Sequence, residues 1–555
     1  GSSKRSRQLT SLIWKEFEIL CVEPDGSQRA QCKWCKRDYA CGGTTGTSNL
    51  WRHLSNCTKR GQSDFEERSP IDQGIYREKM GIAIVKHNHP YRLVEQEGIR
   101  DLCVYLNSDA LPISRNTINT DIEKMYKREK ERVKTELNSI SSRICLTADL
   151  WTSIATDGYL ALTAHFVDED WILQKRVLNF HHMPPPHGGP ILAEKVIDLL
   201  RDWTVEKKVF TITLDNASYN DGMVNLLKQH LRLRNTLFCE GEFFHVRCSA
   251  HVLNLIVQDG VKVISKPVSK IRDCVKYIRA SESRKLKFAE CIVQVSLPCN
   301  KRVHQDVPTR WNSTFVMLDS ALEYKLAFHQ LHVVDRSFSI FYPTEEEWLR
   351  VQKFTTLLRP FYDLTTLFSG TNYPTANLYF HGVWKIQKVI TEEINNLDIE
   401  VSEMAKQMKL KFEKYWECYS LVLSFAIILG PRFKMDYVVY AFKKLYPFDY
   451  EERAKEVRDK FHLLFEKYEN TFDGDLLDGS IAGCSGGDLG NDNDDFAEFE
   501  SQQHANKRNK SQVDSYLDDT RLLSTQELDV LNFWKENKNR YPILSLMARD
   551  ILSIP

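Results

Sequence analysis

The stretch Ser142–Ser153, with the sequence SRICLTADLWTS, decides the fold of this chain. From Arg143 to Asp149, the apolar residues Ile144, Leu146 and Ala148 alternate with Cys145, Thr147 and Asp149. This period of two predicts a half-buried β-strand that ends in a carboxylate. A second stretch, Val209–Asp215 (VFTITLD), has the same alternation and the same ending. In this second strand Phe210, Ile212 and Leu214 are expected to share one face.

Two aspartates that end neighbouring strands at the same edge of a sheet can hold divalent metal ions for phosphoryl transfer. Each aspartate alone has a simpler explanation, because Asp is also a preferred N-cap of a following helix. The pair favours the metal interpretation. Asp149 and Asp215 are therefore the candidate catalytic residues, with Mg²⁺ or Mn²⁺ as the ions if the site is catalytic.

Residues 140–258 around these aspartates are expected to form one α/β domain. Strands are predicted at 143–149, 159–167, 171–180 and 208–215, with helices at about 191–203 and 217–232. Three strands, a helix and a strand ending in Asp form the order of an RNase H-like fold, and that fold places its first two metal ligands at positions corresponding to Asp149 and Asp215. The following His245, Cys248 and His251 form a possible metal site without a clear fourth ligand, and packing or support of the aspartates is the alternative.

The most specific motif is a set of four predicted zinc ligands in the order C-x2-C-x17-H-x3-C: Cys32, Cys35, His53 and Cys57. The first pair suits a tight turn that presents two thiolates to one ion, and a helix over residues 48–56 puts the second pair on one face. Cys41 is a rival ligand. Because a domain this small buries little apolar surface, Zn²⁺ is expected to supply its folding energy.

Charge is concentrated around this motif, although the whole chain has 75 basic and 75 acidic residues. Residues 1–60 hold 11 lysines and arginines against 5 acids, which indicates a local nucleic-acid-binding patch. Asn49 and Arg52, on the outer face of the helix, are candidate readers of adenine and guanine in double-stranded DNA. A solvated face is the alternative, and zinc modules also mediate protein contacts. The expected phosphate contacts are Lys33, Lys36, Arg37, Lys59 and Arg60.

The remaining chain is expected to be mainly helical. A linker (61–75), a helical DNA-binding or oligomerisation region (76–139), a helical insertion (259–472), an acidic disordered segment (473–512) and an apolar C-terminal segment (513–555) are predicted. The apolar C-terminal segment must pack on the α/β domain or on a partner chain. Within the insertion, Arg310 and Trp311 are candidate DNA contacts, although a tryptophan at a helix start is more commonly buried.

The composition also excludes some classes of protein. The longest apolar run, Leu421–Leu429, is far shorter than the ~18 residues of a membrane span, so no membrane contact is expected. No secretory segment begins the chain, which favours the cytoplasm or the nucleus. The 14 cysteines are mostly scattered, which is typical of reduced thiols with one metal site.

Taken together, these motifs resemble a hAT-superfamily transposase of the plant sleeper-like, domesticated kind with a BED-type zinc finger. The segments that carry the resemblance are Trp14 and Phe17 before the zinc motif, SNLWRH in it, LTADLWTS (146–153), TLDNASYND (213–221), RCSAHVLNL (247–255), PTRWNST (308–314), GPRFK (430–434) and the stretch from ELDVLNFW to the end (527–555).

The resemblance implies a multidomain protein in which a small zinc finger precedes an α/β RNase H-like fold, interrupted by a large all-α insertion and closed by a C-terminal dimerisation region. It implies that Asp149 and Asp215 are the first two acids of a DDE triad. It also implies that Cys248 and His251 form the family's CxxH motif, and that Trp311 lies in a DNA-end-binding region. Two departures are that Gly430 replaces the usual Asp, and that the third acid is expected in a helix beyond Pro555.

We therefore expect a nuclear, zinc-dependent, sequence-specific DNA-binding protein that forms a homo-oligomer and acts in transcription or chromatin regulation without strand cleavage. One alternative is a fragment of an active cut-and-paste transposase whose catalytic Glu lies beyond the chain end. Another is a protein-interaction scaffold.

Overall fold

The computed structural model describes residues 11–22, 27–41, 47–59, 71–153, 157–185, 188–298, 302–308, 310–416, 421–478, 511–523 and 528–555. The chain divides into two compact units, Gly1–Arg132 and Val133–Pro555. Most of the expected linker at 61–75, and residues 479–510 of the expected acidic segment, lie outside the described residues. None of the described helices combines the length and the apolar composition that a bilayer crossing requires.

The first unit begins with a small antiparallel sheet and one helix. The short 3-10 helix η1 (Leu12–Lys15) leads into strands paired in the order β1 (Phe17–Ile19), β2 (Arg29–Cys32) and β3 (Asp38–Ala40). Helix α1 (Ser48–Asn56) occupies the residues predicted from the ligand spacing. Its Leu50 and Leu54 are buried against Ile13 and Phe17, as expected for a helix that covers a small sheet.

The second part of the first unit is helical, as predicted. It contains α2 (Gln73–His87), the 3-10 helix η2 (Tyr91–Glu95), α3 (Glu97–Leu106) and the long α4 (Arg115–Ser139), whose last residues belong to the second unit. The breaks fall near Pro90 and Pro112, because proline lacks the N–H that a helix interior needs. Arg77 on α2 donates two hydrogen bonds, of 2.7 and 2.6 Å, to the carboxylate of Asp121 on α4.

The second unit contains a five-stranded mixed sheet. Its strands, in spatial order, are β6 (Leu173–Met183), β5 (Gly158–Val167), β4 (Ile144–Thr152), β7 (Val209–Leu214) and β8 (His245–Arg247). The first three are antiparallel, whereas β4, β7 and β8 are parallel. The four predicted strands are therefore confirmed, but β4 does not end at Asp149 as expected: it continues to Thr152, because its last residues still pair with β5. The three-residue β8 was not predicted, because it is too short to show a period of two.

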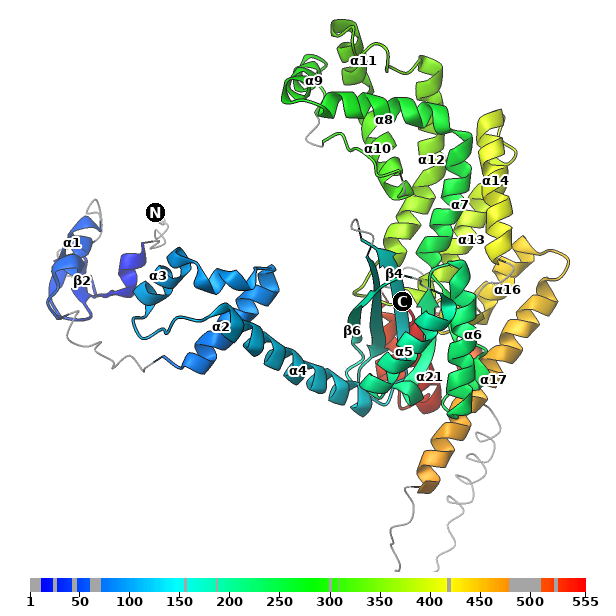
Figure 1. Ribbon diagram of the computed structural model, residues 1–555, viewed down its shortest axis with the longest axis horizontal. Coiled ribbons are helices and arrows are strands. Elements are labelled where there is room, and N and C mark those ends of the chain that lie inside the picture. The colour runs from blue at the N-terminus through cyan, green and yellow to red at the C-terminus, as the bar shows by residue number, and fades with distance from the viewer. Residues whose placement is uncertain are drawn as a thin grey trace, which may run out of the picture. The chain divides into compact units, whose positions relative to one another are not determined.

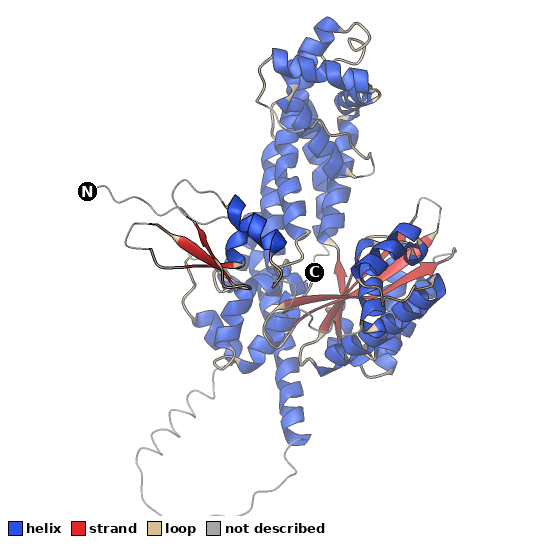
Figure 2. Cartoon of the chain, turned by 90° about the vertical axis from the view of Figure 1, so that its left-hand side faces the viewer, coloured by secondary structure: helices blue, strands red, loops and turns tan. Residues whose placement is uncertain are grey.

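Helices cover both faces of this sheet (Figures 1 and 2). Helices α5 (Gly189–Trp203) and α6 (Ser218–Leu233) pack on the face that carries Ile144, Leu146 and Ala148. Cys145 on the opposite face belongs to a second and larger core, which it shares with the remaining helices. The sheet is thus the layer that joins the two cores of the unit.

The prediction that Phe210, Ile212 and Leu214 share one face of β7 is wrong for Phe210. A register shift between Ile144 and Cys145 leaves Phe210 without a partner on β4, because Ile144 pairs with Val209 and Cys145 with Thr211. Phe210 consequently packs in the core on the Cys145 side, away from Ile212. Such a β-bulge inserts one residue into the strand and reverses the alternation before it.

Two short 3-10 helices, η3 (Glu206–Lys208) and η4 (Phe238–Gly241), precede the insertion. In the part of the insertion that the structure describes, all regular structure is helical, as the resemblance implied. Its helices are α7 (Ser249–Val263), α8 (Ser265–Arg279), α9 (Glu282–Gln294), α10 (Trp311–Glu323), α11 (Lys325–Val334), α12 (Glu345–Phe368), α13 (Ala376–Glu393), α14 (Ile399–Trp416), α15 (Leu421–Ile428), α16 (Lys434–Leu445) and α17 (Tyr450–Asp478). Helix α17 thus extends into the stretch 473–512, which was predicted to be disordered.

The apolar C-terminal segment packs inside its own chain. It forms α19 (Gln512–Asp518), α20 (Val530–Asn537) and α21 (Pro542–Leu552). The Trp534 indole N–H donates to the carbonyl of Leu429 (3.0 Å), and the ammonium of Lys434 donates to the carbonyls of Tyr516 and Asp519. The GPRFK motif and the residue before it therefore form a docking point for this segment.

A buried carboxylate fixes α21 to the sheet. Asp550 is only 2% exposed. It accepts hydrogen bonds from the backbone N–H of Arg143 (2.8 Å) and from the hydroxyl of Tyr468 (2.6 Å). Burial raises the pKa of Asp550, and the hydrogen bond from Tyr468 opposes that rise. The contact joins the first residue before β4 to helices that lie more than 300 positions later.

We expect the substitution Tyr468→Phe to lower the free energy of unfolding of the second unit by about 1–3 kcal/mol, because it leaves a buried carboxylate oxygen without its donor. Urea unfolding of the full chain measures this. The matched control is Tyr450→Phe, which removes a hydroxyl–carboxylate contact at the surface (2.8 Å to Glu451) and is expected to cost less than about 0.5 kcal/mol. Equal stability of the two variants would contradict the prediction.

Candidate functional site

Four side chains of the first unit converge on one point. The ligand atoms of Cys32, Cys35, His53 and Cys57 all lie within 4.8 Å of one another. The Cys35 sulfur lies 3.2 Å from Nε2 of His53, and the sulfurs of Cys32 and Cys57 are 4.0 Å apart. A tetrahedral Zn²⁺ with Zn–S bonds of about 2.3 Å separates its ligand atoms by about 3.8 Å. The arrangement therefore fits a structural zinc ion, and this is the only such cluster among the described residues.

The ring of His53 is held ready for a metal by its neighbours. The Tyr39 hydroxyl lies 2.8 Å from Nδ1, and the two rings stack with their centroids 4.5 Å apart. A partner on Nδ1 fixes the orientation of the ring and leaves Nε2 for the ion. Burial and then the charge of Arg37 lower the pKa of His53, which favours the neutral ring that binds zinc. The sequence alone did not indicate this role of Tyr39.

Two residues near the ligands, Cys41 and Asn49, serve the packing and the backbone of the finger. Cys41, the rival ligand, is buried in the small core and lies outside the ligand cluster. Asn49 uses its amide on the backbone, since it donates to the carbonyl of Ala40 (2.9 Å) and accepts from the N–H of Leu50 (2.9 Å). Its polar groups therefore join α1 to β3, and Arg52 is the exposed member of the predicted pair of base readers.

The basic side chains predicted to contact phosphates are exposed wherever the structure describes them. They lie in the turn between β2 and β3, or just after α1: Lys33, Lys36, Arg37 and Lys59. Arg60 lies outside the described residues. Lys33 also donates to the carbonyl of Lys15 (2.8 Å). These cations give the finger a positive surface around its metal ligands.

The two candidate catalytic acids lie side by side. Thr147 on β4 pairs with Thr213 on the parallel β7. Asp149 lies two residues after Thr147, and Asp215 lies two residues after Thr213. Neighbouring parallel strands bring such residues together at the carboxyl edge of a sheet. Loss of hydration and then the charge of Asp215 raise the pKa of Asp149, whereas Lys175 lowers it.

The loop after β7 is held by three contacts that hydrophobic periodicity did not indicate. Asn220 donates to the carboxylate of Asp215 (2.6 Å), Arg247 donates to Asn216 (3.1 Å), and the N–H of Cys248 donates to the carbonyl of Leu214 (2.8 Å). The only feature of the sequence that pointed to these residues was that they lie in the motifs TLDNASYND and RCSAHVLNL. Only the Asn220 contact reaches the Asp215 carboxylate, and the other two hold the residues on either side of it.

Cys248 lies beside the acid pair without completing a metal site. It is the N-cap residue of α7, and burial raises the pKa of its thiol, with further contributions from Asp149 and Asp215. Burial also lowers the pKa of His245 to about 4. Among the described residues, Cys248, His245 and His251 do not join a convergent group of metal ligands.

Of the two candidate DNA contacts in the insertion, Trp311 is buried and Arg310 is exposed. Trp311 is 4% exposed and belongs to the large core at the start of α10, so its indole is a packing residue in this structure. The expected contact of Trp311 with DNA does not fit this burial. Arg310, one position earlier, is exposed.

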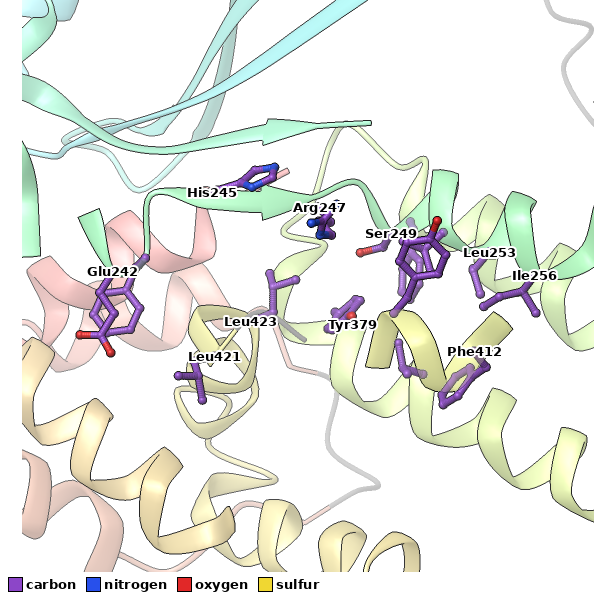
Figure 3. Close-up of a pocket in the computed structure, with 15 residues that line it drawn as sticks. Glu242, His245, Arg247, Ser249, Leu253, Ile256, Tyr379, Phe412, Leu421 and Leu423 are labelled. Carbon is purple, nitrogen blue, oxygen red and sulfur yellow. The ribbon is translucent and has the colours of Figure 1, made fainter. Parts of the chain in front are cut away.

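A cavity of about 280 Å³ lies between β8, α7 and the helices of the insertion (Figure 3). Its walls combine apolar side chains, with Leu253, Ile256 and Phe412 among them, and polar ones such as Glu242 and Ser249, and neither acid of the pair lines it. His245 and Arg247 of β8 line this cavity together with Leu421 and Leu423 (Figure 3). The cavity is therefore a separate space between the sheet and the insertion.

Protein-family models match most of the chain in the order of these structural parts. A BED zinc finger matches residues 12–62, a ZBED1 RNase-like domain 147–243, and a ZBED1 RNase-like helical domain 246–357. A hAT-like transposase RNase-H fold matches residues 377–468, and a hAT family C-terminal dimerisation region matches residues 512–555. The chain thus carries a DNA-binding BED finger and a dimerisation region.

Similar proteins extend over the full length of the chain. Zinc finger BED domain-containing protein RICESLEEPER 2 of Oryza sativa subsp. japonica is 33% identical over 602 residues, covering 100% of this chain and 83% of that protein. Zinc finger BED domain-containing protein DAYSLEEPER of Arabidopsis thaliana is 32% identical over 593 residues, covering 99% of this chain and 82% of that protein. With its zinc cluster, its RNase-like domain, its helical insertion and its C-terminal segment all matched, the chain belongs to the hAT transposase-like family, as a homologue of the plant sleeper proteins with a BED finger.

Proposed function

We propose that this chain is a zinc-dependent, sequence-specific double-stranded DNA-binding protein that acts in the nucleus in transcription or chromatin regulation, without cutting DNA. The observation that carries the proposal is the cluster of four zinc ligands surrounded by exposed cations. The ion holds the sheet and helix of the finger together, and the cations meet the phosphates of the duplex. Because phosphate contacts release counterions, the affinity should fall steeply with salt.

Base recognition is assigned to the exposed side of α1. Arg52 is exposed there and suits a guanine in the major groove. Asn49 remains a candidate for adenine only if it releases the carbonyl of Ala40, to which its amide is bound. A reader in this position acts from a fixed helix, because Leu50 and Leu54 of the same helix are buried.

Self-association through the C-terminal region is the second part of the proposal. The match to a hAT dimerisation region supports it. Most of the large apolar side chains of this region are buried within the chain itself, among them Trp534, Leu544 and Met547. The contact between protomers is therefore proposed to use the exposed residues of the segment, while its buried residues hold it to the rest of the same chain. A homodimer would present two fingers to DNA.

Catalysis of DNA strand transfer is the second candidate function. The adjacent carboxylates of Asp149 and Asp215 favour it, since such a pair can hold a divalent cation that activates a phosphoryl group. Within the described residues, no third His, Cys, Asp or Glu converges with this pair. We therefore assign the acids an ancestral role in this chain. A protein-interaction scaffold, with a finger that binds protein, is the third candidate.

Removal of zinc should abolish duplex binding. We expect the full chain to bind double-stranded DNA with zinc present and to lose that binding after treatment with a chelator, because the finger then loses its folding energy. The substitution Cys35→Ser should act in the same way. Fluorescence anisotropy with a labelled duplex library measures this, and re-addition of zinc is the control. Duplex affinity that is indifferent to chelation would contradict the proposal and favour the scaffold.

The variant Tyr39→Phe should weaken zinc binding by about 10- to 100-fold, because it removes the hydroxyl that orients His53. The phenyl ring keeps the stacking, so that the packing of the finger is preserved. Competition with a colorimetric chelator measures the zinc affinity. Tyr126→Phe, at an exposed tyrosine of α4, is the matched control and should leave the affinity unchanged.

The chain should not cleave DNA with Mg²⁺ or Mn²⁺. Two carboxylates leave a metal pair with too few ligands to stabilise the attacking and leaving oxygens together. Incubation of the full chain with supercoiled plasmid, alongside the variant Asp149→Asn, tests this. Cleavage by the parent that Asp149→Asn abolishes would overturn the expectation and support the transposase function.

A further inference from the structure

A cavity of about 200 Å³ opens at the edge of the sheet where its parallel strands begin. We call it the edge cavity, and Arg143, Lys207, Lys208, Tyr468 and Asp550 line it. Arg143 directly precedes β4, and Lys208 directly precedes the parallel strand β7. The acid pair lies at the opposite edge, since Asp149 is six residues further along the chain, about 20 Å in a strand. The edge cavity is therefore a space distinct from the acid pair.

Arg143 gives the edge cavity a guanidinium that is already oriented. The carbon of this group lies over the ring of Phe238, 3.6 Å from its centroid. Stacking on a ring fixes the plane of a guanidinium and leaves its N–H donors at the rim of that plane. Arg143 is half-buried, and none of the described carboxylates forms an ion pair with its side chain. Its charge-assisted donors are thus open to a ligand.

Lys208 adds a second half-buried cation. Its ammonium donates hydrogen bonds to the carbonyls of Asn138 (2.7 Å) and Ile140 (2.5 Å), which leaves one of its three N–H donors for a ligand. Loss of hydration lowers the pKa of Lys208, and the charge of Glu169 opposes that effect. Glu169 itself is paired with Arg549 (3.2 Å). An anion beside Lys208 would replace part of the lost hydration.

The acid in the wall does not cancel this charge. Both oxygens of Asp550 accept hydrogen bonds, one from the backbone N–H of Arg143 and one from the hydroxyl of Tyr468. The lining thus holds three cations, Arg143 and the two lysines of η3, against this one acid. Lys467 on α17 adds to the field: burial raises the pKa of Cys239 to about 11, whereas Arg143 and Lys467 lower it. The net charge of the edge cavity is positive and favours an anion.

The size of the cavity and the type of its cations indicate which anion. A guanidinium binds phosphate oxygens with paired N–H groups, and an ammonium binds them as a point charge. A space of about 200 Å³ holds roughly six or seven water molecules at about 30 Å³ each, which is more than one phosphate group fills. A DNA duplex needs cations on an open surface, whereas Arg143 and Lys208 are half-buried.

We propose that the edge cavity binds the diphosphate group of a small molecule, with Arg143, Lys207 and Lys208 as its donors. The ligand would lie between the start of β4, η3, α17 and α21, the elements that form the walls. It would consequently strengthen the attachment of the C-terminal segment to the sheet, because a ligand that binds only the folded form stabilises it. The inference goes beyond the proposed DNA-binding function and does not rest on it.

The test uses the full zinc-loaded chain and isothermal titration calorimetry with inorganic pyrophosphate, in a chloride buffer of constant ionic strength without Mg²⁺. Arg143→Gln removes the guanidinium but keeps the backbone N–H that Asp550 requires, and Arg143→Lys keeps the charge. Lys207→Gln changes an exposed side chain, so it tests the site even if Arg143→Gln fails to fold. The matched control is Arg458→Gln, which removes an exposed arginine of α17 outside the cavity.

We expect Arg143→Gln to weaken pyrophosphate binding at least about tenfold, because charge-assisted hydrogen bonds are lost. Lys207→Gln should weaken it about two- to fivefold, since an exposed ammonium contributes less. Arg143→Lys should fall between the parent and Arg143→Gln, and Arg458→Gln should stay within about twofold of the parent. Cys35→Ser should lose duplex binding but keep its pyrophosphate affinity. Failure of the finger and failure of the cavity are thus separable.

Three results would overturn the proposal. Equal pyrophosphate affinity in the parent, Arg143→Gln and Lys207→Gln would show that these side chains do not bind the anion. A loss in Arg458→Gln as large as that in Lys207→Gln would attribute binding to the overall charge of the unit. Competition between pyrophosphate and a duplex in Cys35→Ser would assign the cavity to the DNA backbone. Titration with ADP separates the two sources of the group: binding as tight as that of pyrophosphate supports a nucleotide, and weaker binding supports free pyrophosphate.

Discussion

The parallel pairing of β4 with β7 is the constraint on which the second unit depends. Only this register, with Thr147 opposite Thr213, brings Asp149 next to Asp215. The two strands are separated in sequence by two further strands and a helix, so their pairing carries the entropic cost of closing a long loop. The bulge at Phe210 is part of the same register. It moves one aromatic ring from the α5–α6 side of the sheet into the core of the insertion, and so links the two cores.

The domain is interrupted by a long helical insertion, and polar contacts to the C-terminal segment close it. Asp550 reaches the backbone before β4, and Lys434 binds two carbonyls in and after α19. Both charged groups are buried, and burying a charge is costly unless it is paired or hydrogen-bonded. Such contacts therefore specify one docking position for the segment.

The zinc finger is organised by a different principle, since its ligands are local in sequence and its core is small. The ion replaces the apolar burial that a domain of this size lacks. Tyr39 and Phe17 surround the ring of His53, so the residues that shape the metal site also form the core. The helix that carries two ligands is the one that presents Arg52 to solvent. Folding, metal binding and the exposure of Arg52 are therefore coupled in this unit.

The sequence by itself determined the features that depend on spacing: the four zinc ligands, the presence of the four longer strands, the helical regions, and Asp215 directly after one strand. It did not fix the end of β4, which continues past Asp149 to Thr152 because it goes on pairing with β5. It also determined the family, because the motifs occur in order along the chain. Tertiary structure alone decided the features that depend on contacts between distant residues. These are the bulge at Phe210, the short β8, the burial of Trp311 and the hydrogen bonds of the Asn49 side chain. Periodicity reports which residues share one element, whereas pairing between elements decides which side chains meet and which remain exposed.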